Sequence, residues 1–179
     1  MDCPLDCEYL QEAHKHERLA PLSAEDVPSR EIRVTEEFLE DHTDLVAAAA
    51  RSLMHAAFAT AGAVDRDVRD ALDALVRTFR TLESGVYYET RPVNALASRI
   101  FDSTRSGIEE FRKLEAEKLG MSRTRDADVL GVLVFWQRFA MSHDNSRPRG
   151  RSFLGFLRGS FSEIEGTAPA VPASSLILP

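Results

Sequence analysis

The amino-acid sequence predicts an all-α protein with an up-down four-helix bundle-like core, an extra N-terminal helix and a short C-terminal helix. Apolar residues recur every three or four positions through several long stretches, which is the spacing of one helix face. Proline is absent between Pro28 and Pro92 and again between Pro92 and Pro148, and helix interiors reject proline. Gly62 and Gly120 lie inside these spans, and glycine favours positions just past a helix end. Each span is therefore expected to hold two helices.

The first two predicted helices cover residues 3–19 and 35–61. Pro4 suits the first turn of the first helix, where its missing N–H is not needed. Thr35 supplies a capping oxygen for the second helix, and the two glutamates that follow it complement the helix dipole. The four alanines at residues 47–50 allow a neighbouring helix to approach closely.

The third predicted helix, residues 64–88, has the clearest pattern. Its apolar positions are separated by four or three residues, as in a coiled-coil seam. These positions are Val64, Val68, Leu72, Leu75, Phe79, Leu82 and Val86. Gly85 is a poor helix former, but Val86 keeps the spacing. The helix is therefore expected to continue to residue 88 and to stop before Pro92.

The last three predicted helices cover residues 94–119, 126–143 and 152–164. The helix at 126–143 is apolar on every side, and such a helix must be covered on every side. It is too short to cross a bilayer, which requires roughly 20 apolar residues. We therefore expect it at the centre of the fold. The short helix at 152–164 carries three phenylalanines and is expected to cover one end or side of a bundle whose helices alternate in direction.

Composition bounds the class of protein. The chain has 179 residues, which suits one domain, predicted over residues 1–165, followed by a Pro/Ala/Ser-rich tail at 166–179. A net charge of -7 at pH 7 argues against non-specific nucleic-acid binding. The sequence shows no secretory signal and no membrane span, and its two cysteines exclude a disulfide framework. These features predict a cytoplasmic protein.

Cys3 and Cys7 are candidate metal ligands. Four residues apart on a helix, two thiolates can share one zinc or iron ion. His14 lies about 10 Å further along a straight helix and cannot reach the same ion. The remaining ligands would come from another helix or a second subunit. The alternative is that both cysteines are small apolar packing residues.

An arginine-rich loop precedes the last predicted helix. Arg147, Arg149 and Arg151 alternate with small and polar residues there. Arginines ahead of a helix N-terminus favour an anion site, with a phosphate, a carboxylate or an acidic partner as the ligand. The alternative is a charged surface loop that pairs with the acids of the chain itself.

Catalytic motifs are absent from the sequence. It contains no GxSxG motif and no glycine-rich phosphate loop, and no histidine follows an acid by three positions as in helical di-iron proteins. Tyr87, Tyr88, Glu89 and Arg91 form a polar-aromatic cluster. This cluster either lines a pocket at the end of the bundle or exposes its hydroxyls to water.

The leading functional hypothesis is a cytoplasmic helical interaction or binding protein without evident catalytic activity. It would contact an anionic ligand or acidic partner through the arginine loop and form a homodimer, the commonest closed oligomer. The alternative is a metal- or redox-linked module that uses Cys3 and Cys7. A third hypothesis is a small-molecule enzyme with a pocket near Tyr87 and Glu89.

Overall fold

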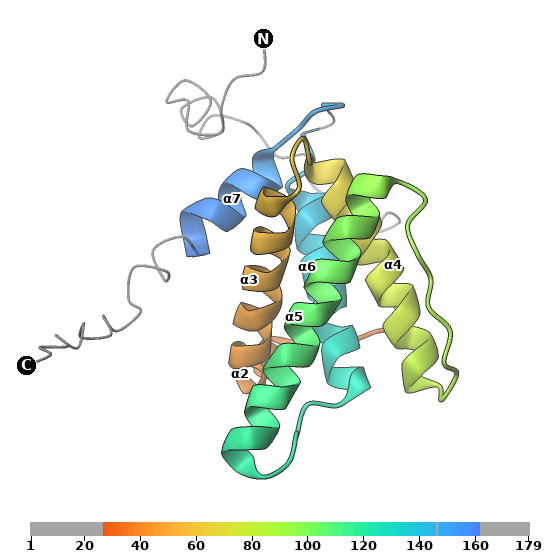
Figure 1. Ribbon diagram of the computed structural model, residues 1–179, viewed down its shortest axis with the longest axis vertical. Helices are drawn as coiled ribbons and strands as arrows, with labels where there is room; N and C mark the ends of the chain where they lie inside the picture. Colours follow the sequence, from red (N-terminus) through yellow and green to blue (C-terminus); the bar gives the residue numbers. More distant parts are fainter. Residues whose placement is uncertain (1–26, 146, 162–179) are drawn as a thin grey trace, which may run out of the picture.

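The structure, a computed structural model, describes residues 27–145 and 147–161. This part of the chain forms six helices and no strand (Figure 1). The helices are α2 (Glu36–Asp41), α3 (Thr43–Ala59), α4 (Asp65–Glu83), α5 (Ala95–Leu119), α6 (Asp126–Ser142) and α7 (Ser152–Phe161). The predicted all-α class and four-helix core are confirmed. The helix expected at residues 3–19 and the tail at 166–179 lie outside the described residues.

Helices α3, α4, α5 and α6 make up the core. Helix α4 packs mainly against α6, and α3 packs mainly against α5. Contacts of α4 with α5 and of α3 with α6 close the bundle, and α7 lies across α3 (Figure 1). None of the helices in the described ranges is long and apolar enough to cross a membrane.

The connection from α4 to α5 is long and extended, unlike a short helical turn. We call residues 84–94 the strap. It runs back along α4, because the Thr90 amide donates to the Thr78 hydroxyl at 3.0 Å and the Asn94 side chain donates to Asp67 in the first turn of α4. Helix α5 therefore begins beside the start of α4, and both helices run away from that end of the bundle and diverge toward their C-terminal ends (Figure 1). The strict alternation of direction expected from the sequence does not hold here.

Helix α4 ends at Glu83, five residues before the predicted end. Gly85 adopts a left-handed conformation with φ of 80°. Its amide bonds to the carbonyl of Leu82 at 2.9 Å, and the Val86 amide bonds to the carbonyl of Thr81 at 2.8 Å. This pair of bonds is the Schellman motif that ends many helices at a glycine. The spacing of Val86 reflects its place in this motif, and the prediction that the helix continues was wrong.

The second predicted helix divides into α2 and α3 at His42. The backbone there leaves the helical region, with φ of -114° and ψ of 24°. The ring of Phe38 on α2 packs over Gly131 of α6, where a Cβ would lie 2.6 Å from the end of the ring. The break lets α2 turn toward α6 and cover its first half.

Helix α6 is the centre of the core, as predicted. Its buried apolar side chains are Val129, Leu130, Val132, Leu133, Val134, Trp136 and Ala140. The indole N–H of Trp136 donates to the Val46 carbonyl of α3 at 3.2 Å. Helix α7 covers the other end of α6, where Phe153 packs against Trp136 and Phe139. The expected role of the aromatic helix as a cover is confirmed.

Candidate functional site

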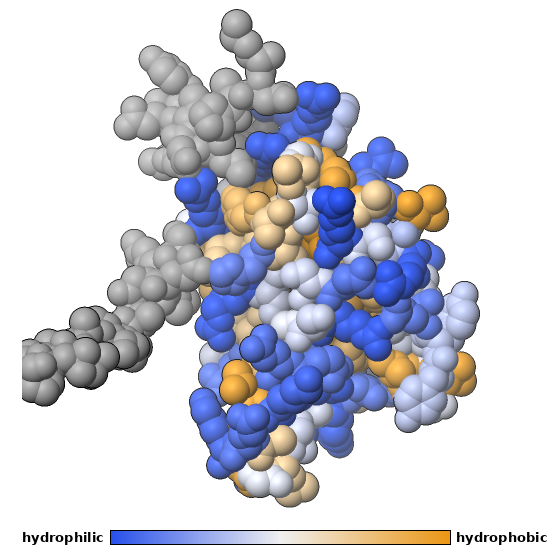
Figure 2. All heavy atoms as spheres, viewed as in Figure 1, coloured by the Kyte–Doolittle hydropathy of each residue, from blue (hydrophilic) through white to orange (hydrophobic). Residues whose placement is uncertain are grey.

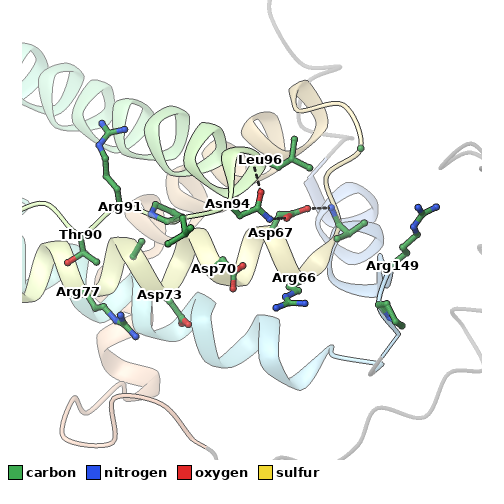
Figure 3. Close-up of a pocket in the computed structure, with 16 residues that line it drawn as sticks. Arg66, Asp67, Asp70, Asp73, Arg77, Thr90, Arg91, Asn94, Leu96 and Arg149 are labelled. Atoms are coloured by element: carbon green, nitrogen blue, oxygen red, sulfur yellow. Dashed lines mark hydrogen bonds between the residues drawn. The ribbon is translucent and has the colours of Figure 1, made fainter.

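A hollow of about 750 Å³ lies between α4, the strap and the loop before α7 (Figure 3). We call it the arginine groove. Its floor is the polar face of α4, which lies opposite the apolar seam. The helical spacing of α4 therefore places its apolar side chains in the core and its charged side chains in the groove. The charged side chains that line it are Arg66, Asp67, Asp70, Asp73, Arg77, Arg91 and Arg149.

Two of the three carboxylates in the groove are held by hydrogen bonds within the fold. Asp67 accepts a hydrogen bond from the side chain of Asn94, and it also caps the start of α4 by accepting from a backbone amide at 2.9 Å. Asp73 accepts from the side-chain amide of Gln137 on α6. These two acids therefore hold the strap and α6 against α4.

Asp70 is the third carboxylate, and its pKa lies above the ordinary value of an aspartate. Burial raises the pKa of Asp70, and the nearby carboxylates of Asp73 and Asp67 raise it further, against the opposing effect of Arg66 and Arg69. Asp70 therefore binds a proton more readily than an exposed aspartate does.

The arginines of the groove come from three segments. Arg66 and Arg77 project from the exposed face of α4, and neither forms an ion pair or a hydrogen bond with another residue in the described ranges. Arg91 in the strap pairs with Glu89 and with Asp102 at 2.8 Å. Two guanidinium groups of α4 therefore remain available to a ligand.

The arginine loop meets the groove through Pro148 and Arg149. Arg149 lines the groove at the same end as Arg66 (Figure 3). Arg147 is exposed and Arg151 is half-buried, and neither lines the groove. Sequence reasoning missed Arg66 and Arg77 as partners of the loop. Their positions opposite the seam of α4 were visible in the sequence, but their distance from the loop was not.

The backbone amides at the start of α7 already bind a carboxylate of the protein. Asp65 accepts hydrogen bonds from the amides of Phe153 and Leu154 at 3.1 and 3.0 Å. Its side chain is buried, and burial raises its pKa to about 6 although these bonds and Arg69 oppose the shift. An external anion near the arginine loop would therefore contact side chains rather than the helix N-terminus.

Two other arginines near the loop have structural contacts. Arg138 donates to three backbone carbonyls in residues 28–32, at 2.8 to 3.2 Å, and fixes the segment before α2 on α6. The guanidinium of Arg158 lies 5.7 Å from the ring centre of Phe58, at cation–π distance. These side chains stabilise the fold and add little to a binding surface.

The predicted metal ligands Cys3 and Cys7 lie outside the described residues. In the ranges 27–145 and 147–161, no three histidine, cysteine, aspartate or glutamate side chains converge on a point that could hold a metal ion.

The tyrosine cluster does not converge on a pocket. Tyr87 and Tyr88 are 95% and 64% exposed. Glu89 forms ion pairs with Arg91 and Arg105, which fasten the strap to α5. Of the four cluster residues, only Arg91 lines the arginine groove.

Comparisons of the chain with models of protein families, with curated proteins and with solved structures give no match.

Proposed function

We propose that this protein is a cytoplasmic helical interaction protein that binds an anionic ligand or an acidic segment of a partner in the arginine groove. One observation carries the proposal: Arg66 and Arg77 of α4 line the same groove as Arg149, which lies more than 70 positions further along the chain. Guanidinium groups form paired hydrogen bonds with carboxylates and phosphates. The lining holds four arginines and three aspartates, and Asp67 and Asp73 already accept hydrogen bonds from Asn94 and Gln137.

The lining of the groove favours binding over catalysis. Among the described residues that line it there is no histidine, cysteine, serine or lysine. The carboxylates of Asp67 and Asp73 accept hydrogen bonds from Asn94 and Gln137, and no histidine or lysine of the lining lies beside Asp70 as a partner for proton transfer. The groove instead combines charged side chains with apolar ones such as Val93 and Leu96, which suits recognition of a chain segment.

The proposal is tested with two probes, a fluorescein-labelled octaglutamate peptide and inorganic phosphate as its competitor. The Arg66→Gln Arg77→Gln Arg149→Gln variant should bind the peptide at least about tenfold more weakly, since a lost charge-assisted hydrogen bond costs roughly 1.5–3 kcal/mol. Arg99→Gln is the matched control, because Arg99 is an exposed arginine of α5 outside the groove. Displacement by phosphate would identify a small anion site; its absence would identify an extended acidic segment.

Three results would reject the proposed groove. The triple variant could bind octaglutamate as tightly as the unchanged protein. The Arg99→Gln control could lose as much affinity as the triple variant. An octalysine peptide could bind as well as octaglutamate, which would show that the positive charge does not select the ligand.

The second candidate function is a metal- or redox-linked module at Cys3 and Cys7. The four-residue spacing of the only two cysteines supports it. This candidate and the proposed homodimer are tested by the same mass measurement, described in the Discussion.

A further inference from the structure

Helix α5 is longer than its neighbours, and its apolar face continues beyond the part that the other helices cover. It has 25 residues, whereas the other core helices have 17 to 19. Its C-terminal end projects beyond the other helices (Figure 1). Its last buried residue is Ile108. Phe111 and Leu114 continue the stripe by one further turn, but Leu114 is 48% exposed, and Leu119 at the helix end is 53% exposed.

The uncovered stripe forms one wall of a second groove of about 750 Å³. The other wall is the junction of α2 and α3. We call this hollow the acidic groove. The apolar side chains that line it are Leu45, Phe111, Leu114 and Leu119. Figure 2 shows hydrophobic atoms enclosed by hydrophilic ones at the end of the molecule where α2, α3 and α5 meet.

The wall opposite α5 carries negative charge. Glu40, Asp41 and Asp44 line the groove and are exposed. Their carboxylates make no ion pair or hydrogen bond with other residues of the described ranges. The lining also holds Arg51, Lys118 and Arg123, and its five acids, which include Glu115 and Asp128, outnumber these three basic residues. An exposed apolar floor beside one acidic wall has the chemistry that receives a helix with one apolar and one basic face.

We propose that the acidic groove binds a basic amphipathic helix of a partner protein. The apolar face of that helix would cover Leu114 and Leu119, and its lysines or arginines would pair with the acids of the α2–α3 wall. This contact is separate from the arginine groove and does not depend on it.

Charge decides between this partner and the other possible occupants. Residues 1–26 contain seven acids and only two lysines or arginines, and residues 162–179 contain two acids and no basic residue. Both ends of the chain would be repelled by the acidic wall. A second copy that faced this wall with its own acidic wall would meet the same repulsion.

The test uses the full chain and a fluorescein-labelled 16-residue helical peptide of leucine and lysine with one apolar face. Two variants probe the groove, Leu114→Ser Leu119→Ser and Glu40→Gln Asp41→Asn Asp44→Asn. Each should weaken binding of the peptide at least tenfold, and the second should also reduce the dependence of binding on salt. Because these five side chains are exposed, thermal unfolding of both variants should match the unchanged protein.

Matched controls distinguish binding of the peptide in the groove from non-specific binding elsewhere on the surface. Val86→Ser removes an exposed apolar side chain that lines neither groove. Glu83→Gln Glu110→Gln Glu117→Gln removes three exposed acids that do not line the groove. Both controls should bind within twofold of the unchanged protein. A peptide with glutamate in place of lysine, and one with the same residues in scrambled order, should bind at least tenfold more weakly.

Four results would overturn the proposal. Either groove variant could bind within twofold of the unchanged protein. The glutamate peptide could bind as tightly as the lysine peptide. The leucine variant could convert a dimer to a monomer, which would make a second copy the occupant. Finally, a synthetic peptide of residues 162–179 could displace the probe, which would make the tail of this chain the occupant.

Discussion

The buried carboxyl of Asp65 links the stability of the fold to pH. Its pKa in the folded protein is about 6, above the ordinary value of 3.8, because burial disfavours the charged form. The folded state therefore binds this proton more tightly than the unfolded chain. The stabilising contribution is complete below about pH 4 and is lost as the pH rises through about 6, by at most about 3 kcal/mol.

The Asp65→Asn variant tests this linkage because asparagine cannot titrate. Urea unfolding of both proteins between pH 4 and pH 7.5 gives the difference in the free energy of unfolding. We expect the unchanged protein to lose stability relative to the variant as the pH rises. A difference that stays constant, or that changes in the opposite direction, would contradict the raised pKa.

Thr104 carries a second unusual polar group. Its side chain is fully buried, and its hydroxyl has no hydrogen-bond partner in the described part of the chain. Thr104→Val keeps the shape and removes the unpaired hydroxyl, so the free energy of unfolding should increase by about 1 kcal/mol. Thr60→Val is the matched control, because the Thr60 hydroxyl donates to the Ala56 carbonyl at 2.8 Å and its loss should destabilise. Equal effects of both changes on the free energy of unfolding would contradict the conclusion that the Thr104 hydroxyl is unpaired.

Helix caps formed by neighbouring residues could be predicted from the sequence, whereas a cap formed by a residue far away in the sequence could not. Thr35 caps α2 by accepting a hydrogen bond from the backbone within three residues, as predicted. Gly120 ends α5 in the left-handed conformation, as its position suggested. Asp65 caps α7 across 88 positions of sequence, and no local pattern indicates such a pairing. The anion site expected at the start of α7 was drawn from local sequence alone and could not account for this internal carboxylate.

At the scale of elements, the contact between α3 and α5 depends on Gly107. An added Cβ at this position would lie 2.8 Å from the Cβ of Ser52, whose hydroxyl is fixed by a hydrogen bond to Ala48. Gly107→Ala should therefore destabilise the protein by roughly 1–3 kcal/mol, as overpacking does. In an open helix position the same change would be stabilising.

Gly159→Ala in α7 is the matched control for Gly107→Ala. Nothing lies within 4 Å of a Cβ at that site, so stability should rise by about 0.5–1 kcal/mol. Thermal unfolding of the two variants should shift the midpoint in opposite directions. A shift in the same direction would mean that the close approach of α3 and α5 does not limit the side chain at Gly107.

The helices themselves were predictable, whereas their connections were only partly so. The 3.6-residue period located α5 and α6 almost to the residue, because burial of one face or all faces leaves a repeating pattern. The period also continued through Val86, where the backbone had already left the helix. The strap has no period of its own, since hydrogen bonds to Thr78 and Asp67 of α4 hold it. The placement of the starts of α4 and α5 at one end of the bundle follows from those bonds and was not visible in the sequence.

At the scale of the whole molecule, the two grooves lie at opposite ends of the bundle. The arginine groove lies beside the starts of α4 and α5, and the acidic groove lies beside the end of α5 (Figure 1). The net charge of -7 gives no sign that an arginine-lined groove and an acidic groove lie at different ends of the molecule. Sequence reasoning identified the arginine loop but missed the acidic groove, because Leu114 fits the spacing of an ordinary core position on α5. Only the limited length of α3 and α6 reveals that the side chains of Leu114 and Leu119 remain uncovered.

The number of subunits and the presence of a metal can be decided by one measurement on the whole protein. Native mass spectrometry of untagged protein, purified without added metal, should give the mass of a dimer if the proposed homodimer is correct. The aromatic side chains of α7 pack largely on their own core, with Phe153 fully buried, so the contact would use other surfaces. Dilution that leaves only the monomer at micromolar concentration would exclude a stable dimer.

The same spectrum tests the cysteine hypothesis. A mass increment of one zinc or iron ion per subunit or per dimer should disappear in the Cys3→Ser Cys7→Ser variant if those thiolates hold the ion. An increment shared between two subunits would explain how a two-cysteine segment completes four ligands, and it would join the metal and dimer proposals into one. A metal-free dimer would leave the binding proposal as the better account, since its arginines and carboxylates need no ion to act.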